Sequence, residues 1–394
     1  MVLFIGLIQG ADPLFTQAHG ARDATALGRT LQRGILLCLI LCPILFLCWT
    51  LADEGLQMLG QDAKLTGKAA YYVEAQIFSI PAILGFALMR QYLQGRGVLA
   101  PIVWTIILAN VANVIFNELF IFGGWGIPAQ GIEGAGRATG ASRILMLLML
   151  MGFMLRGRHL KDGWTPWTRR SLDPRGLFRL LRFGLPVMVH IGVEVWTFQA
   201  TTLMAGKIGE EALAAHVIVL KIISFTFMFP WGLSGASTTR VGNLLGSREI
   251  EKARSTARMA LLLTAGIMTF IGACVLWLGP VIPSIFSRDA TVLALATSLL
   301  PIAAGFQIFD GIQAVSAGVL RGAGQTVPAA VMGLIGFPLI TLPLAYHWTF
   351  NTELGLRGIW WAFMVGLFIA ASLLTGWLFH SARKWTPLKR QLDT

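Results

Sequence analysis

The stretch LLPIAAGFQIFDGIQAVSAGV, residues 299–319, decides the class of this protein. It is long enough to cross a bilayer as one helix, because a spanning helix needs about 20 mostly apolar residues. Its one charged residue is Asp310. A charge at the centre of a spanning helix costs about 2.5–3.5 kcal/mol of insertion free energy. The stretch therefore predicts a membrane helix whose buried acid has a functional or structural role that offsets this cost.

Apolar segments of similar length occur along the whole chain. Hydrophobic residues make up 55% of the 394 residues and charged residues only 13%, about half the charge of a soluble domain. We therefore predict an all-α polytopic membrane protein. Residues 1–16 form a shorter apolar stretch that resembles the second half of a helix. The ten full spans that we expect are 34–52, 71–93, 101–122, 132–155, 183–205, 212–239, 256–278, 291–318, 328–348 and 356–380.

The formal net charge of +12 does not indicate a nucleic-acid-binding protein, because the basic residues cluster in short loops between apolar segments. Of the 31 Lys and Arg residues, 23 lie in one alternate set of loops and 6 in the other. Loops rich in Lys and Arg stay in the cytoplasm, so we expect the C-terminus and the loop 156–182 on that side. Such clusters also meet lipid headgroups. We expect the lipid bilayer, and no nucleic acid, as a partner.

The cysteines and the known catalytic motifs argue against an enzyme. Cys38, Cys42, Cys48 and Cys274 lie within apolar segments, without the spacing of a zinc site or a disulfide framework. The sequence contains no P-loop and no HExxH motif. We also find no nucleophile at a plausible spacing from a base. We therefore expect no enzyme activity, no cofactor and no cysteine-based metal site.

Three short motifs occur twice, in the same order and with nearly the same separation between the two copies. This separation covers an even number of helices, so both copies are expected to have the same orientation, as parallel repeats have. The second copy has about seventy residues before its first motif and the first copy 19, which predicts that roughly fifty residues of the first copy precede Met1. The motif pairs are Gly20-Ala-Arg-Asp23 with Gly246-Ser-Arg-Glu249, Leu93-Gln-Gly-Arg-Gly97 with Leu320-Arg-Gly-Ala-Gly324, and Gly131-Ile-Glu-Gly134 with Gly355-Leu-Arg-Gly358.

Two acids, Glu194 and Asp310, lie inside predicted spans of the second copy. Polar residues three or four positions away share a helix face with each acid. Such a stripe predicts a cation or proton site that faces a water-filled cavity. The alternative is a structural hydrogen bond to a neighbouring helix. The stripe of Glu194 contains His190, Thr197 and Thr201, and that of Asp310 contains Gln307 and Gln313.

Two further polar features allow two interpretations each. Lys221 provides a counter-ion to one of the acids, or its side chain extends from the span to the membrane interface. Asn110, Asn113 and Asn117 follow one another at helical spacing. Such an amide stripe bonds neighbouring helices together or binds a ligand.

Taken together, these residues resemble the multidrug and toxic compound extrusion (MATE) family, in its NorM-like bacterial branch. The resemblance runs along the whole chain. The motifs that carry it are Phe183-Gly-Leu-Pro186 before Glu194, Glu211-Ala-Leu-Ala-Ala-His216, Arg240-Val-Gly-Asn243 with Gly246, Asp310 before Leu320-Arg-Gly322, and Asn117 before Gly131-Ile-Glu-Gly134.

The resemblance implies two pseudo-symmetric six-helix lobes around a central cavity that opens alternately to each side. With the first helix of the family absent from the sequence, about 11 helices are expected. Residues 1–156 would form an incomplete N-lobe with helices 2–6 of the family. Residues 157–182 would be a basic cytoplasmic linker, and residues 183–394 a C-lobe with helices 7–12 and a short cytoplasmic tail.

The resemblance also implies secondary active export of organic cations or amphipathic drugs in exchange for Na⁺ or H⁺. Glu194 and Asp310 match the cation-binding acids of the C-lobe, where Na⁺ would bind. Asn113 and Asn117 match asparagines of the N-lobe site, whose acid lies in the absent first helix. The coupling ion would be the only cofactor. Candidates for the substrate cavity are His190, Thr197, Phe306, Gln307, Gln313 and Lys221.

A monomer in the bacterial inner membrane is expected, with several spans and a cytoplasmic C-terminus. Within the same superfamily, the alternative is a flippase for lipid-linked saccharides, which a strongly basic cavity would favour. An inactive truncated remnant is a further alternative. A membrane-embedded enzyme would need a catalytic set, and a receptor would normally carry a sizeable soluble domain.

Overall fold

The computed structural model describes residues 1–58, 63–124, 126–157, 159–160, 163–279 and 281–388. Within these residues the chain is helical, with a single isolated bridge between Gly124 and Ile127 and no strand. The prediction of an all-α polytopic protein with ten spans is confirmed. The spans are Ala24–Thr50, Ala70–Gly95, Ala100–Phe122, Gly131–Arg156, Pro174–Ile208, Glu210–Gly246, Ile250–Leu278, Ala290–Gly322, Val327–Phe350 and Leu356–Ala382.

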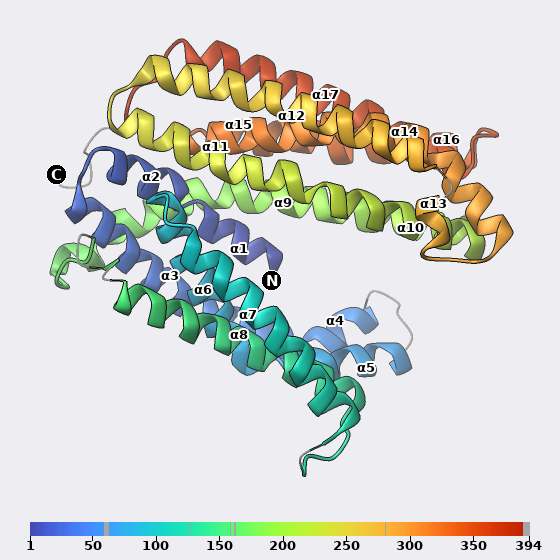
Figure 1. Cartoon of the computed structure of the whole chain (residues 1–394), viewed down its shortest axis with the longest axis horizontal. Coiled ribbons are helices and arrows are strands. Elements are labelled where there is room, and N and C mark those ends of the chain that lie inside the picture. Colours follow the sequence, from blue (N-terminus) through green and yellow to red (C-terminus); the bar gives the residue numbers. More distant parts are fainter. Residues whose placement is uncertain (59–62, 125, 158, 161–162, 280, 389–394) are drawn as a thin grey trace. The chain divides into compact units, whose positions relative to one another are not determined.

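The helices form two compact units, Leu3–Leu181 and Arg182–Thr394. In the first unit, α6 packs against α3 and α8, and α7 packs against α8 (Figure 1). Leu84, Leu88 and Leu93 of α6 are fully buried in its core. Its elements are α1 (Val2–Gln9), α2 (Asp12–Gly20), α3 (Ala24–Thr50), α4 (Ala52–Met58), α5 (Ala63–Glu74), η1 (Ile77–Ser79), α6 (Ile80–Gly95), α7 (Ala100–Asn117), η2 (Glu118–Phe122), α8 (Gly131–Arg156) and η3 (Arg169–Leu172).

In the second unit, α14 is the central helix and packs against α10, α11, α12 and α17 (Figure 1). The first turns of α9 belong to the first unit, and the rest of α9 belongs to the second. The elements are α9 (Pro174–Ile208), α10 (Glu210–Thr226), α11 (Met228–Gly246), α12 (Ile250–Leu278), α13 (Val281–Ser284), α14 (Ala290–Gly322), α15 (Val327–Leu334), η4 (Ile335–Thr341), α16 (Leu342–Phe350) and α17 (Leu356–Ala382).

Prolines interrupt two of the expected spans, 212–239 and 328–348. Proline has no N–H, and its ring clashes with the carbonyl four residues earlier. The α-helix α10 ends at Thr226, four residues before Pro230. In the other span, α15 gives way to the π-helix η4 after Leu334, four residues before Pro338. By contrast, Pro186 and Pro301 lie inside the continuous helices α9 and α14.

The apolar stretch at the N-terminus also differs from the expected single helix. It forms two short helices, α1 and α2, separated by Gly10 and Ala11. The N–H groups of these two residues bond to the carbonyls three residues earlier, as in a 3₁₀ turn. Pro13 follows in the first turn of α2, where its missing N–H is tolerated. The proline therefore begins a new helix and does not continue α1.

The expected linker 157–182 is more ordered than its polar composition suggests. Its last residues, from Pro174 onward, are the first turns of α9. Residues before them are hydrogen-bonded to α3, so this segment is packed onto the first unit. The bonds run from Gln32 Nε2 to the Thr165 carbonyl (2.5 Å), from Ser171 Oγ to Gln32 Oε1 (2.6 Å), and from Arg33 Nη2 to the Arg170 carbonyl (2.9 Å).

The repeated motifs adopt the same backbone conformation in both units. Positive φ angles are uncommon outside glycine, yet Arg22 and Arg248, the third residues of the paired motifs, both have one. Each lies just after a helix and just before the next. The internal repeat is therefore confirmed by backbone geometry as well as by sequence. The paired φ angles are 55° at Arg22 and 64° at Arg248, 74° at Gly97 and 76° at Gly324, and 56° at Gly131 and 52° at Gly355.

Candidate cation site in the C-terminal unit

The central helix α14 is held close to its neighbours by small residues. A Cβ atom at Gly311 would lie 2.8 Å from Met268 Cγ of α12, so glycine is required for this approach. From α11, Ser234 Oγ donates a hydrogen bond to the Ala314 carbonyl at 2.7 Å. One turn further on, Thr238 Oγ1 donates to the Gly318 carbonyl, also at 2.7 Å. These contacts fix the helix that carries Asp310.

Asp310 lies within α14 and is 4% exposed. Its Oδ1 atom has no hydrogen-bond partner among the described residues. Glu194 of α9 is half-buried and close enough to interact electrostatically with Asp310. The described part of the chain records no ion pair between either acid and a basic residue. Two nearby carboxyl groups in a site of low dielectric constant favour a bound cation or proton, because like charges there repel each other.

The polar stripes of α9 and α14 face each other, as their spacing suggested. Gln313 and His190 form a hydrogen bond of 3.1 Å between Nε2 atoms. On the other side of Asp310, Thr226 Oγ1 donates to Gln307 Oε1 at 2.9 Å. The structure therefore brings four predicted residues, His190, Glu194, Gln307 and Gln313, to the neighbourhood of Asp310.

Thr197 and Thr201 are buried, but their hydroxyl groups bond within α9. Thr197 Oγ1 donates to the Val193 carbonyl at 2.8 Å, and Thr201 Oγ1 donates to the Thr197 carbonyl at 3.1 Å. Such back-bonding satisfies the hydroxyl donor on its own helix. These threonines lie on the predicted face, but their donors are already used.

Phe306 lies in an aromatic core, although we proposed it for the substrate cavity. It is fully buried. Its ring lies edge-on to three other rings, with centroid distances of 6.3 Å to Phe198, 5.9 Å to Trp360 and 5.7 Å to Phe363. Edge-on aromatic contacts stabilise a core beyond the area that they bury. The burial of Phe306 favours a packing role.

Lys221 of α10 has an exposed side chain. The described residues record no ion pair between it and Glu194 or Asp310. Of the two interpretations of this lysine, the counter-ion is therefore not observed. Its exposure agrees with a side chain that extends away from the unit's core.

In the N-terminal unit, Asn113 and Asn117 form a short hydrogen-bonded chain. Asn117 Nδ2 donates to Asn113 Oδ1 at 3.1 Å, and Asn113 Nδ2 donates to Ser142 Oγ of α8 at 2.9 Å. Asn110 instead bonds to the Ile106 carbonyl of its own helix. The stripe therefore connects α7 to α8, which is the structural interpretation of these asparagines.

Sequence reasoning missed Thr226 and Gly333, two residues that support the site. Thr226 ends α10 and bonds to Gln307. A Cβ atom at Gly333 of α15 would lie 2.7 Å from His190 Nδ1, so this glycine makes room for the imidazole. The position of Thr226, four residues before Pro230, could have identified it as the end of a helix. Nothing in the sequence connects Gly333 to His190. Among the described residues, no three His, Cys, Asp or Glu side chains gather as metal ligands would.

Comparison with known proteins places these features in a family. The MatE family model matches residues 1–119 and 186–347. The chain is 32% identical over 382 residues to the probable multidrug resistance protein NorM of Agrobacterium fabrum, covering 92% of this chain and 79% of that protein. It is 29% identical over 362 residues to multidrug and toxin extrusion protein 1 of Xenopus tropicalis. That match covers 91% of this chain, which spans 62% of the frog protein's length.

Solved structures of MATE transporters share the fold of this chain. The eukaryotic MATE transporter AtDTX14 superposes with a TM-score of 0.87 at 26% identity, covering 97% of this chain and 86% of that one. An outward-facing MATE family transporter shares the fold, with a TM-score of 0.86 at 20% identity, over 97% of this chain and 84% of that one. The NorM relatives support the predicted bacterial branch, although animal proteins match as well. The names of these relatives are those of transport proteins rather than enzymes. The chain therefore belongs to the MatE family.

Proposed function

We propose that this protein is a secondary active transporter that exports organic cations or amphipathic drugs in exchange for Na⁺ or H⁺. Relatives named for multidrug resistance and toxin extrusion support this activity. The ten apolar spans support a location in a bilayer. The bias of Lys and Arg in the loops supports the bacterial inner membrane with a cytoplasmic C-terminus.

One observation carries the proposal: Asp310 is a buried acid inside a membrane-spanning helix, with Glu194 beside it and no basic partner among the described residues. An acid in that setting is costly unless a cation or a proton accompanies it. The same pair favours a cationic substrate over a lipid-linked saccharide, whose phosphates would need basic groups.

The mechanism follows from competition for the two carboxyl groups. In one state of the transporter, the pair binds the coupling ion. A cationic drug that binds near the pair weakens the hold on that ion, because like charges repel each other in a low-dielectric site. Binding of one cation thus expels the other. Alternating exposure of the site to the two sides converts this competition into exchange.

The test is exchange by the purified full-length chain in liposomes. A fluorescent organic cation is loaded, and its export is followed after a Na⁺ gradient or a pH gradient is imposed. Asp310→Asn should insert normally and abolish exchange, and Glu194→Gln should do the same. Asp289→Asn is the matched control on the same helix, because Asp289 is an exposed N-cap residue and asparagine caps helices equally well.

The wild type and the control should exchange at the same rate. Exchange retained by inserted Asp310→Asn would contradict the assignment of the site. Absence of exchange from the inserted wild type under both gradients would contradict the proposed transport.

A further inference from the structure

His190 and Gln313 form a buried contact beside the two acids. His190 is 8% exposed and Gln313 is 1% exposed. Their Nε2 atoms are 3.1 Å apart, so the glutamine amide donates to the imidazole nitrogen. On its other side, the imidazole meets α15 at Gly333, the position without a Cβ atom. The ring is thus enclosed by three helices, which argues against the direct substrate contact that we expected from its place in the stripe.

This contact fixes the register between α9 and α14. Glu194 follows His190 by four residues, about 6 Å along α9, and Asp310 precedes Gln313 by three residues, about 4.5 Å along α14. The helices α9 and α14 are the first and fourth spans of the second unit, so they run in opposite directions. Each acid therefore lies one turn beyond the contact, in the same direction. A sliding movement of either helix would separate the carboxyl groups.

We propose that His190 and Gln313 are a positioning pair that holds Glu194 level with Asp310 and thereby sets the affinity of the site for its coupling cation. This inference rests on the proposed function. Neither residue binds the cation itself. The pair acts through the relative position of the two acids, since a cation held by both carboxyl groups binds tightly only when both oxygens reach it.

The pair also has a plain alternative role, which is to join helices. Many interhelical hydrogen bonds in membrane proteins do so, with an average effect of about 0.6 kcal/mol and a maximum of about 1.7 kcal/mol. A joining contact would change the amount or the stability of the folded protein. It would leave the concentration of cation that half-saturates exchange unchanged, and this difference makes the proposal testable.

The experiment measures exchange by the full-length chain in liposomes over a series of Na⁺ concentrations and, separately, of pH values. Two variants remove the contact, His190→Ala and Gln313→Met, the second with little change in volume. We expect both to raise the half-saturating cation concentration by about threefold to seventeenfold, the range that corresponds to one interhelical hydrogen bond. The maximal rate should stay within about twofold of the wild type.

Two further variants serve as controls. His190→Gln keeps a side chain that bonds to Gln313, so it should restore the wild-type half-saturation to within about twofold. Ser316→Ala removes another buried contact of α14, the 3.1 Å bond to Thr375 of α17. Ser316 lies three residues from Gln313, but its partner is not on α9. We expect this variant to leave the half-saturating concentration unchanged.

A second readout does not depend on transport. The coupling cation should raise the thermal midpoint of the detergent-purified protein by an amount that grows with the logarithm of its concentration relative to its Kd. The variants without the contact should need a correspondingly higher concentration for the same rise. Wild-type half-saturation in both His190→Ala and Gln313→Met would overturn the proposal, as would an equal shift in Ser316→Ala. A wild type that binds the cation without exchanging drug would contradict the proposed function and leave the pair to be judged by the thermal measurement.

Discussion

Helices α6 and α14 are counterparts in the two units, yet their chemistry differs. Gly97 and Gly324 occupy the same position in the repeated turn, so aligning them pairs the residues of the two helices in sequence. In this alignment, Gln307, Asp310 and Gln313 of α14 correspond to Ile80, Ile83 and Phe86 of α6. The repeat has kept the turns that define the fold, while one copy of this helix has a polar stripe and the other an apolar one. Backbone geometry and side-chain chemistry are therefore separable in this molecule.

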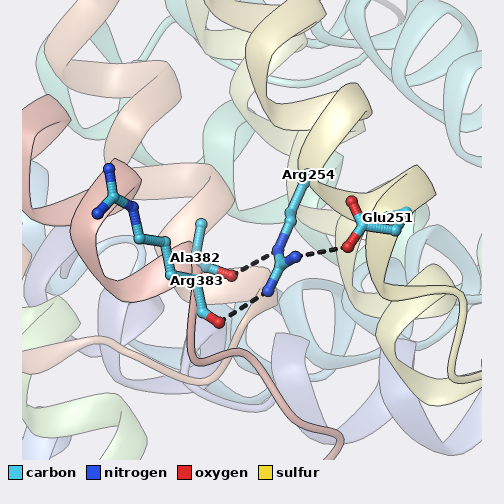
Figure 2. A network of polar contacts seen from close by, with 4 residues as sticks. All are labelled: Glu251, Arg254, Ala382 and Arg383. Atoms are coloured by element: carbon cyan, nitrogen blue, oxygen red, sulfur yellow. Dashed lines mark hydrogen bonds and ion pairs between the residues drawn. The ribbon is translucent and has the colours of Figure 1, made fainter.

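The same principle holds at the start of the helices α3 and α12. Gly28 and Arg254 are counterparts when Arg22 is aligned with Arg248. A Cβ atom at Gly28 would lie 2.7 Å from the Gly163 carbonyl, so this glycine lets the segment after α8 approach α3. Figure 2 shows that Arg254 instead donates to the carbonyls of Ala382 (2.7 Å) and Arg383 (2.8 Å) at the end of α17.

The largest expected effect on stability comes from replacing the packing residues of α6 and α14. Leu84 is fully buried, and its counterpart is Gly311. Leu84→Ala should lower the free energy of unfolding by about 2–5 kcal/mol through loss of buried volume. Gly311→Leu should lower it by about 1–3 kcal/mol by overpacking against Met268. Thermal midpoints in detergent measure both. A neutral Gly311→Leu would show that α14 has room that the structure does not show.

The polar stripe can be exchanged in the same way. Ile83→Asp places an acid in α6 at the position that corresponds to Asp310, at an insertion cost of about 2.5–3.5 kcal/mol. We expect much less inserted protein. Asp310→Ile should insert at least as well as the wild type, because it removes that cost, but should lose exchange. The amount of membrane-inserted protein measures both effects. Equal amounts of Ile83→Asp and wild type would mean that α6 also faces a polar environment.

At the start of α12, Arg254→Met should lower the free energy of unfolding by about 1–3 kcal/mol, because charged hydrogen bonds to two carbonyls are lost. Methionine retains the apolar stem of the side chain. Glu251→Gln is the control, since Glu251 is exposed and bonds to Arg254 on the solvent side (Figure 2). It should have little effect. A larger loss of unfolding free energy in Glu251→Gln than in Arg254→Met would show that the ion pair, and not the two bonds to carbonyls, provides the stabilisation.

The smallest effect concerns Glu249, the acid that precedes α12. Hydrogen bonds from Lys252 and Ser247 lower the pKa of its carboxyl group below the usual 4.5. A lowered pKa in the folded state means that the contact stabilises the protein above pH 4.5 and that this contribution disappears as the pH falls further. In Glu249→Gln, stability should therefore fall slightly less than in the wild type as the pH is lowered. An unchanged pH profile of the thermal midpoint would show that this exposed contact contributes nothing.

The apolar runs predicted the ten spans, and the spacing of His190, Glu194, Gln307, Gln313 and Asp310 predicted two polar stripes. Helical periodicity is local, so a single sequence reveals it. The pairing of His190 with Gln313 depends on residues 123 positions apart and on Gly333, and no local pattern encodes it.

The features that hydropathy and family position do not describe have equally physical reasons. The breaks after Thr226 and Leu334 were readable, because each lies four residues before a proline, but hydropathy alone does not register a missing N–H. Phe306 was placed in the substrate cavity by its position in the family. Its burial among aromatic rings depends on side chains of α9 and α17, which a family motif on α14 does not describe.

The central claim is that drug and coupling cation compete for the acid pair of the C-terminal unit. The most direct test adds an organic cation to the purified full-length chain in weakly buffered detergent solution and measures the H⁺ or Na⁺ that is released. The account predicts release from the wild type and from Asp289→Asn, but none from Asp310→Asn. Drug binding to the wild type without release of either ion, or equal release from Asp310→Asn, would contradict it.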